Sequence, residues 1–592
     1  MAIARKSIAL ISGVILFLAI AIYGNLDSPF AYQILSHLSC RNSLLPVCNP
    51  VNAETVEPTA KGKNGVVVST QREASQLGLQ ILQDGGNAID AAVAMGYGLA
   101  VSDPCCGNLG GGGFMLIRLA NGEETFIDFR ETAPLAANKD MYLDEAGNIV
   151  EGLSTEGYLA VGVPGTVKGL NYALTKYGTM KRDRVIKPAI ALAEDGYSLH
   201  QGDVDIFEAG KEKLEKPNVA EIFLKNGEVY QPGEVLIQSD LAATLTSIAE
   251  SQTDAFYQGE IAEKIVAASQ DNQGILSLED FANYQVNEAE PVKCDYRGYQ
   301  VISSPPPGGG TTVCQMLNIL SGYDLKAFGW RTPVSLHHFF ASMLLAFGDR
   351  NRYLGDPNFV DNPVERLLSE EYAAKLREKI AYPAIPPESV YNNIQPEGTN
   401  TTHYSVVDRE GNAVAVTYTI NSYFGAGVIA PGTGFLLNNE MDDFTSKVGE
   451  ANQFGLRQGE ANIIEPGKRP LSSMSPTIVT KEGKVYLVTG SPGGSTIPTT
   501  VVQVITNVID YDLNLSEAVN TPRLHYQGFP DRILSEPNAV NPETIRGLKL
   551  RGYSIIPFRT WGAAESIMLN PETGLLEGVN DVRKPAGKAL AY

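Results

Sequence analysis

A threonine at the junction of a loop and a strand offers this chain a route to covalent chemistry. Asn400, Thr401 and Thr402 lie where a polar segment meets a run typical of a strand. Cleavage before Thr401 would create an α-amino group there, and the pKa of such a group is about 7.7–8.0. That amino group can deprotonate the hydroxyl of its own residue, which unites base and nucleophile. Taken alone, the motif favours an ordinary β-branched start of a strand.

A pair of glycines offers a site for a developing negative charge. Gly493 and Gly494 follow Ser491-Pro492, between an expected strand and an expected helix. Successive amides at a helix N-terminus form a positive concavity that suits an oxyanion. A tight turn explains the same residues equally well. The sequence differs from G-x-S-x-G, so it does not predict the nucleophile elbow of a serine hydrolase.

Charged and polar residues next to expected strands form a third group of candidates. Arg130 can hold a carboxylate with both arms of its guanidinium, although the local sequence favours a salt bridge to a neighbouring acid. Glu440 and Asp443 lie in an acidic run that can hold an ammonium group or form a solvated turn. The further polar candidates in loops that follow strands are Asn421, Ser472 and Ser473.

Composition excludes several classes of function. The 592 residues include 46 Lys and Arg and 67 Asp and Glu, for a formal net charge of −21. This charge disfavours binding to nucleic acid or to anionic lipid. A hydrophobic content of 43% with 19% charged residues is typical of a globular chain. No C-x-x-C, H-E-x-x-H or P-loop pattern occurs, so the sequence predicts no metal site and no cofactor.

The N-terminus has the pattern of an export signal. Arg5 and Lys6 precede an uncharged apolar run over residues 7–23, which is short for a span of about 20 residues. We therefore expect residues 1–23 to be a cleaved signal, with an uncleaved anchor as the alternative. Residues 24–60 read as a linker. The body is expected in the periplasm or outside the cell, either released or tethered.

The cysteines carry a separate expectation. In an oxidising compartment Cys40 and Cys48 are able to pair. The adjacent Cys105 and Cys106 are not expected to pair with each other.

Hydrophobic periodicity predicts a body of strand hairpins and separate helices. Strands are expected at 65–69 and 301–304, and hairpins join 114–119 to 125–128, 401–408 to 413–419, 477–480 to 485–489, and 566–570 to 575–578. Helices are expected at 73–83, 88–100, from 311, at 336–350 and 497–511, and over most of 167–287. Segregated hairpins and helices predict an α+β body in which helices cover antiparallel sheets.

Seven motifs together resemble one family, the γ-glutamyltransferases (γ-glutamyltranspeptidases, glutathione hydrolases). Their order matches the family from about residue 60 to the C-terminus. The motifs begin at Gly85-Gly86-Asn87-Ala88, Asn108-Leu109-Gly110-Gly111, Asp128-Phe129-Arg130-Glu131, Thr401-Thr402-His403-Tyr404-Ser405, Leu437-Asn438-Asn439-Glu440, Lys468-Arg469-Pro470-Leu471-Ser472-Ser473 and Gly490-Ser491-Pro492-Gly493-Gly494.

The resemblance implies a fold and a maturation step. It implies a four-layer αββα sandwich of the N-terminal-nucleophile hydrolase type. The precursor would cut itself between Asn400 and Thr401. The large subunit would be 61–400 and the small subunit 401–592, and the two would form a heterodimer.

It also implies residue roles. Thr401 would attack the γ-carbonyl of glutathione or another γ-glutamyl donor, Thr419 would support it, and the amides of Gly493 and Gly494 would hold the oxyanion. Water, an amino acid or a dipeptide would then take the γ-glutamyl group. The donor carboxylate would bind Arg130 and Ser472 with Ser473 close by, and the donor amino group would bind Asn421, Glu440 and Asp443.

Three departures from the family pattern are visible. Glu440 stands where many bacterial members carry Gln. Phe454 replaces a usual Tyr in the lid loop that aligns with 448–459, which removes the polar contact of that Tyr. The sequence Asp103-Pro104-Cys105-Cys106 before the glycine run is unusual.

Two alternatives remain at this point. A β-lactam acylase that cleaves glutaryl side chains would share the self-cleavage but need no ammonium site, and Glu440 with Asp443 argues against it. A tethered, uncleaved and non-catalytic binding protein is the alternative from another class.

Overall fold

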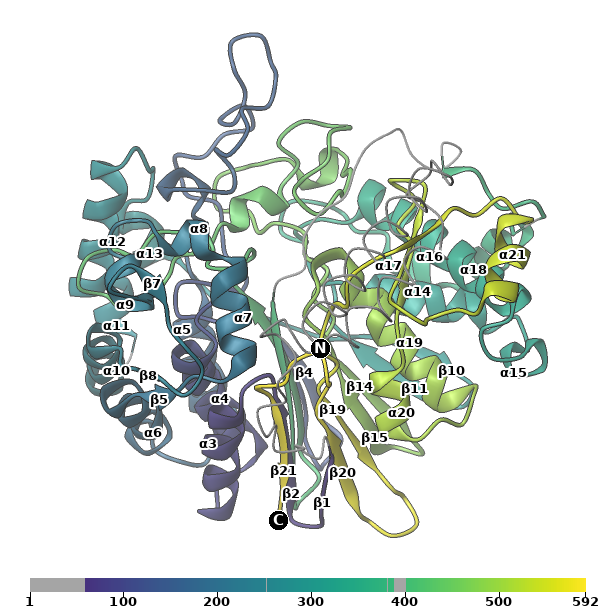
Figure 1. The fold of residues 1–592 in the computed structure, drawn as a ribbon, viewed down its shortest axis with the longest axis horizontal. Helices are drawn as coiled ribbons and strands as arrows, with labels where there is room; N and C mark the ends of the chain where they lie inside the picture. Colours follow the sequence, from purple (N-terminus) through teal and green to yellow (C-terminus); the bar gives the residue numbers. More distant parts are fainter. Residues whose placement is uncertain (1–58, 252, 381, 388–400) are drawn as a thin grey trace, which may run out of the picture. The chain divides into compact units, whose positions relative to one another are not determined.

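Two antiparallel sheets lie face to face between two groups of helices (Figure 1). The structure, a computed structural model, describes residues 59–592 except 252, 381 and 388–400, all within the unit Pro58–Tyr592. The predicted leader, Cys40, Cys48 and Asn400 lie outside the described residues. Within the described ranges, no helix has both the length and the apolar character needed to cross a membrane.

The first sheet carries the threonine candidate near its centre. Its strands in spatial order are β21 (Lys588–Ala591), β2 (Gly65–Ser69), β12 (Thr402–Asp408), β13 (Ala413–Thr419), β3 (Gly112–Arg118), β4 (Glu124–Asp128) and β9 (Asn287–Ala289). Every neighbouring pair is antiparallel. The predicted hairpins β3–β4 and β12–β13 are confirmed.

The second sheet has the same number of strands and the same antiparallel pairing. Its strands in spatial order are β1 (Thr59–Gly62), β20 (Leu576–Val579), β19 (Ser566–Leu569), β15 (Lys484–Thr489), β14 (Thr477–Lys481), β11 (Tyr299–Ser303) and β10 (Val292–Tyr296). The predicted hairpins β14–β15 and β19–β20 are confirmed. The remaining short strands are β5 (Tyr197–Ser198), β6 (Leu224–Lys225), β7 (Glu228–Val229), β8 (Val235–Leu236), β16 (Leu524–His525), β17 (Ile533–Ser535) and β18 (Ile555–Pro557).

The alternation of side chains explains why both faces of the sheets are covered. In β2, Val66 and Val68 belong to the core between the sheets, whereas Val67 belongs to the core under the helices. In β3, Phe114 belongs to the core between the sheets and Met115 to the core under the helices. Successive residues of a strand point to opposite faces, so apolar residues in consecutive positions predict a strand that is buried on both sides.

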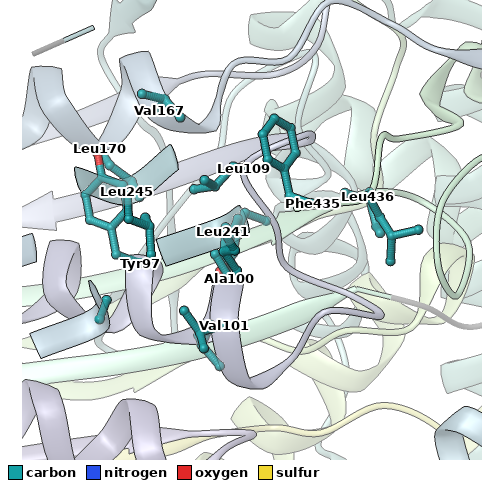
Figure 2. Close-up of a cluster of buried hydrophobic side chains, with 14 of the residues drawn as sticks. Tyr97, Ala100, Val101, Leu109, Val167, Leu170, Leu241, Leu245, Phe435 and Leu436 are labelled. Carbon is teal, nitrogen blue, oxygen red and sulfur yellow. The ribbon is translucent and has the colours of Figure 1, made fainter. Parts of the chain in front are cut away.

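Helices from the first half of the chain cover the first sheet. They are α3 (Arg72–Gln83), α4 (Ala88–Ser102), α5 (Thr166–Tyr177), α6 (Arg182–Asp195), α7 (Gln201–Ala209), α8 (Lys211–Leu214), α9 (Ala220–Phe223), α10 (Ser239–Ser251), α11 (Asp254–Tyr257), α12 (Glu260–Asp271) and α13 (Leu278–Asn283). Figure 2 shows part of this core, where Tyr97 and Ala100 of α4 meet Leu241 and Leu245 of α10. Asn87 caps α4 by accepting hydrogen bonds from Ile89 N and Asp90 N.

The other group of helices covers the second sheet. They are α14 (Gly310–Leu320), α15 (Leu325–Phe328), α16 (Pro333–Tyr353), α17 (Val364–Leu368), α18 (Glu370–Glu378), α19 (Ile497–Ile509), α20 (Leu515–Asn520) and α21 (Pro542–Lys549). Val313 of α14 and Val501 of α19 share a core with Val479 and Leu487 of the sheet. The predicted four-layer αββα architecture is therefore confirmed.

The prediction that Cys105 and Cys106 do not pair was wrong, because the structure joins them in a disulfide. They lie in a turn after α4, where Asp103 O accepts hydrogen bonds from Cys106 N at 3.1 Å and Gly107 N at 3.3 Å. In an extended strand, neighbouring side chains point to opposite faces, whereas this turn brings the two sulfurs together. A second disulfide, which no sequence pattern predicted, joins Cys294 of β10 to Cys314 of α14.

Candidate active site

Thr401 lies immediately before β12 and beside the end of β13. It is 4% exposed, and its Oγ1 donates to Oγ1 of Thr419 over 3.4 Å. Thr419 Oγ1 also accepts a hydrogen bond of 2.8 Å from Asn421 N. The pairing of Thr402 with Tyr418 fixes the register of the two strands, and thereby brings the two threonine hydroxyls together.

One buried cavity gathers all of the predicted donor-binding residues around Thr401. The cavity is lined by Thr401, Thr419 and Gly494 together with Arg130, Asn421, Glu440, Asp443, Ser472 and Ser473. These residues come from segments far apart in the sequence. No sequence motif indicated a role for other lining residues, among them Arg350, Ser495 and Leu456.

Arg130 binds two of the predicted acids directly. Its side chain is fully buried, its Nη1 pairs with Glu440 and its Nη2 pairs with Asp443. Glu131 Oε2 lies 3.6 Å from Arg130 Nη1. The family resemblance predicted that Arg130 would bind the donor carboxylate and that the two acids would bind the donor amino group, whereas here all three form one ion-pair cluster.

Acids outnumber the guanidinium in this cluster. Burial alone would lower the pKa of Arg130, but Glu440 and Asp443 outweigh it and raise that pKa above its usual value. Burial raises the pKa of Glu131 to about 7, and it also raises the pKa of Glu440 and of Asp443. Within the described residues, Glu440 Oε2 and Asp443 Oδ1 have no hydrogen-bond partner. The cluster therefore presents acceptor atoms that suit an added ammonium group.

A second guanidinium lies near the two serines. Arg350 of α16 is 1% exposed, and its Nη2 donates to Ser473 Oγ over 3.1 Å. Ser472 Oγ accepts a hydrogen bond from Met474 N, and Ser472 N donates to Pro307 O. The sequence indicated only that a helix ends near Arg350, because a basic residue in the last turn of a helix is common at surfaces.

The two glycines form the turn between β15 and the helical segment that follows. Gly493 has a φ of 140° and Gly494 a φ of 53°, both in the region that glycine tolerates best. Gly493 O accepts hydrogen bonds from Thr496 N and Thr496 Oγ1, which fixes the turn. Neither glycine amide donates a hydrogen bond to another of the described residues. Both amides are therefore available to an oxyanion beside Thr401.

Thr401 also lines a second cavity on the side of Gly493. Its other lining residues include Tyr423, Trp561, Arg583 and Lys584. Arg583 is held by ion pairs with acidic side chains, whereas Lys584 Nζ lies 5.9 Å from the Tyr423 ring centroid and has no ion pair within the described residues. No sequence pattern indicated this cation, which lies near the C-terminus.

The loop 448–459 makes side-chain hydrogen bonds to the rest of the site through Gln453 and Gln458. Gln458 Nε2 donates to Asp443 O over 2.9 Å. Gln453 Oε1 accepts a hydrogen bond of 2.6 Å from Ser422 Oγ, and Gln453 N donates to Asp442 Oδ2. Phe454 is 4% exposed and lines the first cavity. Gln453 and Gln458 therefore anchor the loop by hydrogen bonds, while Phe454 gives the cavity an apolar wall.

A cluster near the site has the residue types of a metal centre. Candidate ligand atoms of Asp103, Cys105 and Cys106 lie within 4.8 Å of one another. Because the two sulfurs are bonded to each other, neither is a thiolate in this structure, and thiolate is the form that binds metal.

The fold and the position of Thr401 define the class of N-terminal-nucleophile hydrolases. A single chain of cephalosporin acylase from Bacillus halodurans has the same fold, with a TM-score of 0.81 and 30% identity over 93% of this chain and 99% of that chain. Gamma-glutamyltranspeptidase from Helicobacter pylori is 44% identical with a TM-score of 0.53, over 55% of this chain and 93% of that chain.

Sequence comparison identifies the family. The profile of the family described as Gamma-glutamyltranspeptidase matches residues 74–591. A glutathione hydrolase proenzyme from Pseudomonas sp. (strain A14) is 50% identical over 563 residues, which cover 92% of this chain and 96% of that protein. The corresponding proenzyme from Escherichia coli (strain K12) is 47% identical, over 92% of this chain and 95% of that protein. The chain therefore belongs to the gamma-glutamyltranspeptidase family.

Proposed function

We propose that the chain is the precursor of an enzyme that transfers γ-glutamyl groups from glutathione and related donors to water, amino acids or dipeptides. Family membership and the glutathione hydrolase relatives support this assignment. The observation that carries it is that Thr401 lines one cavity together with Arg130, Glu440 and Asp443. A nucleophile next to a charge cluster of this kind suits a donor with one carboxylate and one ammonium group.

Maturation begins with cleavage between Asn400 and Thr401. Thr401 Oγ attacks the carbonyl carbon of Asn400, the peptide C–N bond breaks, and the resulting ester is opened by water. The products are 61–400, preceded by any retained leader, and 401–592. The Helicobacter pylori chain supports this division, because the share of this chain that it covers is close to that of residues 61–400.

The mature site has the parts needed for acyl transfer. The new α-amino group of Thr401 takes the proton of Oγ1, which attacks the donor γ-carbonyl. The amides of Gly493 and Gly494 stabilise the oxyanion, and Thr419 orients Oγ1 over the 3.4 Å contact. The leaving amine takes the proton, and a γ-glutamyl ester remains on Thr401. Water or an acceptor amine then cleaves this ester.

Donor recognition uses the ion-pair cluster. The donor carboxylate binds Arg130 and Ser472, with Ser473 held nearby by Arg350. The donor ammonium binds Glu440, Asp443 and the Asn421 side chain. The donor head carries one carboxylate and one ammonium group, so it adds no net charge to the cluster. Because both acids already contact Arg130, donor binding replaces part of this ion-pair network.

The second cavity suits the other half of the substrate. It shares Thr401 with the first cavity, includes none of the charge cluster and is lined by Lys584. The peptide that leaves glutathione ends in a carboxylate, and Lys584 is placed to bind it. Lys584→Met should therefore weaken binding of peptide donors and acceptors more than that of a donor with an uncharged aromatic leaving group.

A glutaryl acylase is the second candidate, favoured by the fold shared with cephalosporin acylase. Asp443→Ala separates the two functions when rates with γ-glutamyl and glutaryl anilides are compared. Loss of the ammonium partner should lower kcat/KM for the γ-glutamyl donor by a factor that corresponds to roughly 2–5 kcal/mol of binding free energy. The kcat/KM for the glutaryl donor should fall less. Equal losses with both donors would favour the acylase.

Export completes the proposal. Arg5, Lys6 and the apolar run 7–23 support transport out of the cytoplasm, to the periplasm or the outside, either released or tethered. Fractionation of cells that leaves all activity in the cytosol would contradict this location.

A further inference from the structure

The Cys105–Cys106 disulfide lies against the segment that carries Asn421. Cys106 O accepts a hydrogen bond of 3.1 Å from Ile420 N, and Cys105 O accepts one of 3.0 Å from Phe424 N. The two acceptors belong to adjacent residues, and the two donors bracket 421–423. The disulfide-bonded pair therefore holds both ends of this short segment.

The segment between these two hydrogen bonds reaches the donor site. Asn421 has a φ of 74°, and its Nδ2 donates to Asn439 O over 3.0 Å. Ser422 N donates to Asn439 Oδ1 over 3.0 Å. Asn439 directly precedes Glu440, so one side of the segment is attached to the acid cluster and the other side to the cysteine carbonyls.

The disulfide restrains the Cys105 carbonyl directly and the Cys106 carbonyl only through the Cα to which it is attached. A bond between adjacent sulfurs closes a small ring that contains the peptide bond of the two residues. The ring restricts the backbone dihedral angles on both sides of that peptide bond. Opening the ring restores conformational freedom to the turn. The turn loses this freedom again when both hydrogen bonds form, so the two bonds are less stable in the reduced protein.

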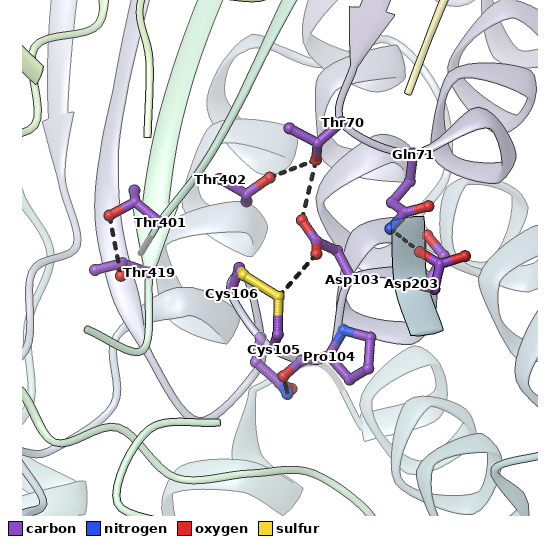
Figure 3. The surroundings of a disulfide bond; sticks show 12 residues. Thr70, Gln71, Asp103, Pro104, Cys105, Cys106, Asp203, Thr401, Thr402 and Thr419 are labelled. Carbon is purple, nitrogen blue, oxygen red and sulfur yellow. Dashed lines mark hydrogen bonds between the residues drawn. A yellow bond between two sulfur atoms is a disulfide. The ribbon is translucent and has the colours of Figure 1, made fainter. Parts of the chain in front are cut away.

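A second connection leads from the same turn to the nucleophile strand (Figure 3). Cys105 Sγ lies 3.2 Å from Asp103 Oδ1, and Asp103 Oδ2 accepts a hydrogen bond of 3.0 Å from Thr70 Oγ1. Since the proton of Thr70 is used there, Thr402 Oγ1 donates to Thr70 Oγ1 over 2.7 Å. A thiol at Cys105 would gain Asp103 Oδ1 as an acceptor, which stabilises the opened form of the turn.

We propose that the Cys105–Cys106 disulfide is a redox-sensitive positioning element that keeps Asn421 in place for donor binding. This inference rests on the proposed function of the site. Two molecules of a small thiol reduce the bond, which yields the two cysteine thiols and one disulfide of the reductant. Glutathione and its cysteine-containing leaving peptide belong to that chemical class. Both cysteines are only 1% exposed, so the exchange requires the turn to open and proceeds slowly.

The test compares oxidised and reduced enzyme with a donor that is not a thiol. Dithiothreitol is removed after reduction, and mass spectrometry of alkylated peptides identifies the disulfides that have opened. With γ-glutamyl anilide, reduction at Cys105 and Cys106 should raise the donor KM by about three- to tenfold, the effect of one weakened hydrogen bond. The kcat should change less than the KM, because the weakened hydrogen bond is one that the donor head makes, and reoxidation should restore the KM.

Matched variants separate positioning from general loosening. Cys105→Ser/Cys106→Ser should have the raised KM without any reductant. Cys294→Ser/Cys314→Ser removes the disulfide between β10 and α14 and should keep the oxidised wild-type KM and its response to dithiothreitol. If the first variant fails to fold, reduction of the native enzyme gives the same comparison.

Three outcomes would overturn the inference. The first is an unchanged KM after proven reduction at Cys105 and Cys106. The second is an equal rise of KM in both double variants. The third is a loss of kcat without a change in KM. An oxidised wild-type enzyme that is processed and folded but inactive toward every γ-glutamyl donor would instead contradict the proposed function.

Discussion

At the scale of single residues, Thr401 owes its assigned role to its surroundings. Its hydroxyl contacts Thr419, and the residue borders both the charge cluster and the cavity with Lys584. A donor that reacts at Thr401 would extend into both cavities, with the γ-glutamyl head on one side and the leaving peptide on the other. Under the proposed function, the position of Thr401 between two differently charged cavities would account for recognition of both halves of one substrate.

The glycine turn gives a prediction at this scale. Gly494→Val should reduce kcat by about 10²–10³, equivalent to about 3–4 kcal/mol, because its φ of 53° disfavours a β-branched residue and the amide would move. Steady-state kinetics on the purified variant measures the change, and circular dichroism establishes that it is folded. A folded variant with normal kcat would assign the oxyanion to other groups.

The candidate donor-binding residues that the structure brings to one cavity were predictable from their motifs, whereas Arg350 and Lys584 were not. Residues of the first group have neighbours in the sequence that identify them. Arg350 lies in the last turn of a helix and Lys584 follows a hairpin, and in both places a basic residue is common on a surface. Their proximity to Ser473 and Thr401 depends on tertiary packing, which no local pattern contains.

At the scale of elements, the glycine run 107–113 controls how closely β13 approaches its neighbours. A Cβ on Gly111 would lie 1.9 Å from Thr419 O, and one on Gly107 would lie 2.4 Å from Thr402 Cγ2. These positions need glycine for close approach of backbones. The run thereby places Thr419 and the start of β12 at the contact distances seen in the site.

Gly111→Ala should disturb the end of β13. The added Cβ must displace Thr419 O, at a cost of about 1–3 kcal/mol in unfolding free energy, and kcat should fall because Thr419 moves. Gly459→Ala is the matched control, since its φ is −89° and its nearest contact to a new Cβ is an ordinary 3.4 Å. Urea denaturation and kinetics on both variants measure the difference. Equal stability and kcat in the two would refute the packing argument.

Regular elements were predictable because each depends on local periodicity. The four hairpins follow alternating or β-branched runs around short turns, and the structure contains all of them. The Cys105–Cys106 bond was not predicted, since its formation depends on a turn whose backbone direction is set by Asp103 O. Short turns of this kind carry no periodic signal.

At the scale of the whole molecule, the two predicted subunits share both sheets. In the first sheet β2 lies between β21 and β12, and in the second sheet β1 pairs with β20 and β11 with β14. Strands from residues 61–400 and from 401–592 are thus joined by backbone hydrogen bonds and by a common core. Cleavage at residue 400 would leave a heterodimer whose halves cannot separate without unfolding.

Buried histidines give the molecule a pH dependence of stability. Burial lowers the pKa of His403 to about 3, so the folded state keeps it neutral, whereas the unfolded chain takes up a proton below about pH 6.5. The contribution of His403 to the free energy of unfolding is complete above pH 6.5. It falls by about 1.4 kcal/mol per pH unit as the pH decreases toward 3. The buried acids Glu131 and Asp442 have pKa values raised to about 7 and about 6. Their contributions to the free energy of unfolding therefore increase as the pH falls, opposite to that of His403.

His403→Gln isolates the histidine term. Its free energy of unfolding should decline less steeply than that of the wild type between pH 6.5 and 4.5, whatever its stability at pH 7. Urea titrations at several pH values give the two slopes. Parallel slopes would mean that His403 has the same pKa in the folded and unfolded chain.

The role of Thr401 as N-terminal nucleophile is tested by the chain composition of purified wild-type protein and of Thr401→Ala. Intact mass and N-terminal sequencing should find two wild-type chains, one of which begins at Thr401 and ends at Tyr592. Thr401→Ala should remain one chain without activity, because both cleavage and acyl transfer need the hydroxyl. A Thr401→Ala protein that is cut at the same bond, or a wild-type enzyme that is active as one uncut chain, would contradict Thr401 as the N-terminal nucleophile.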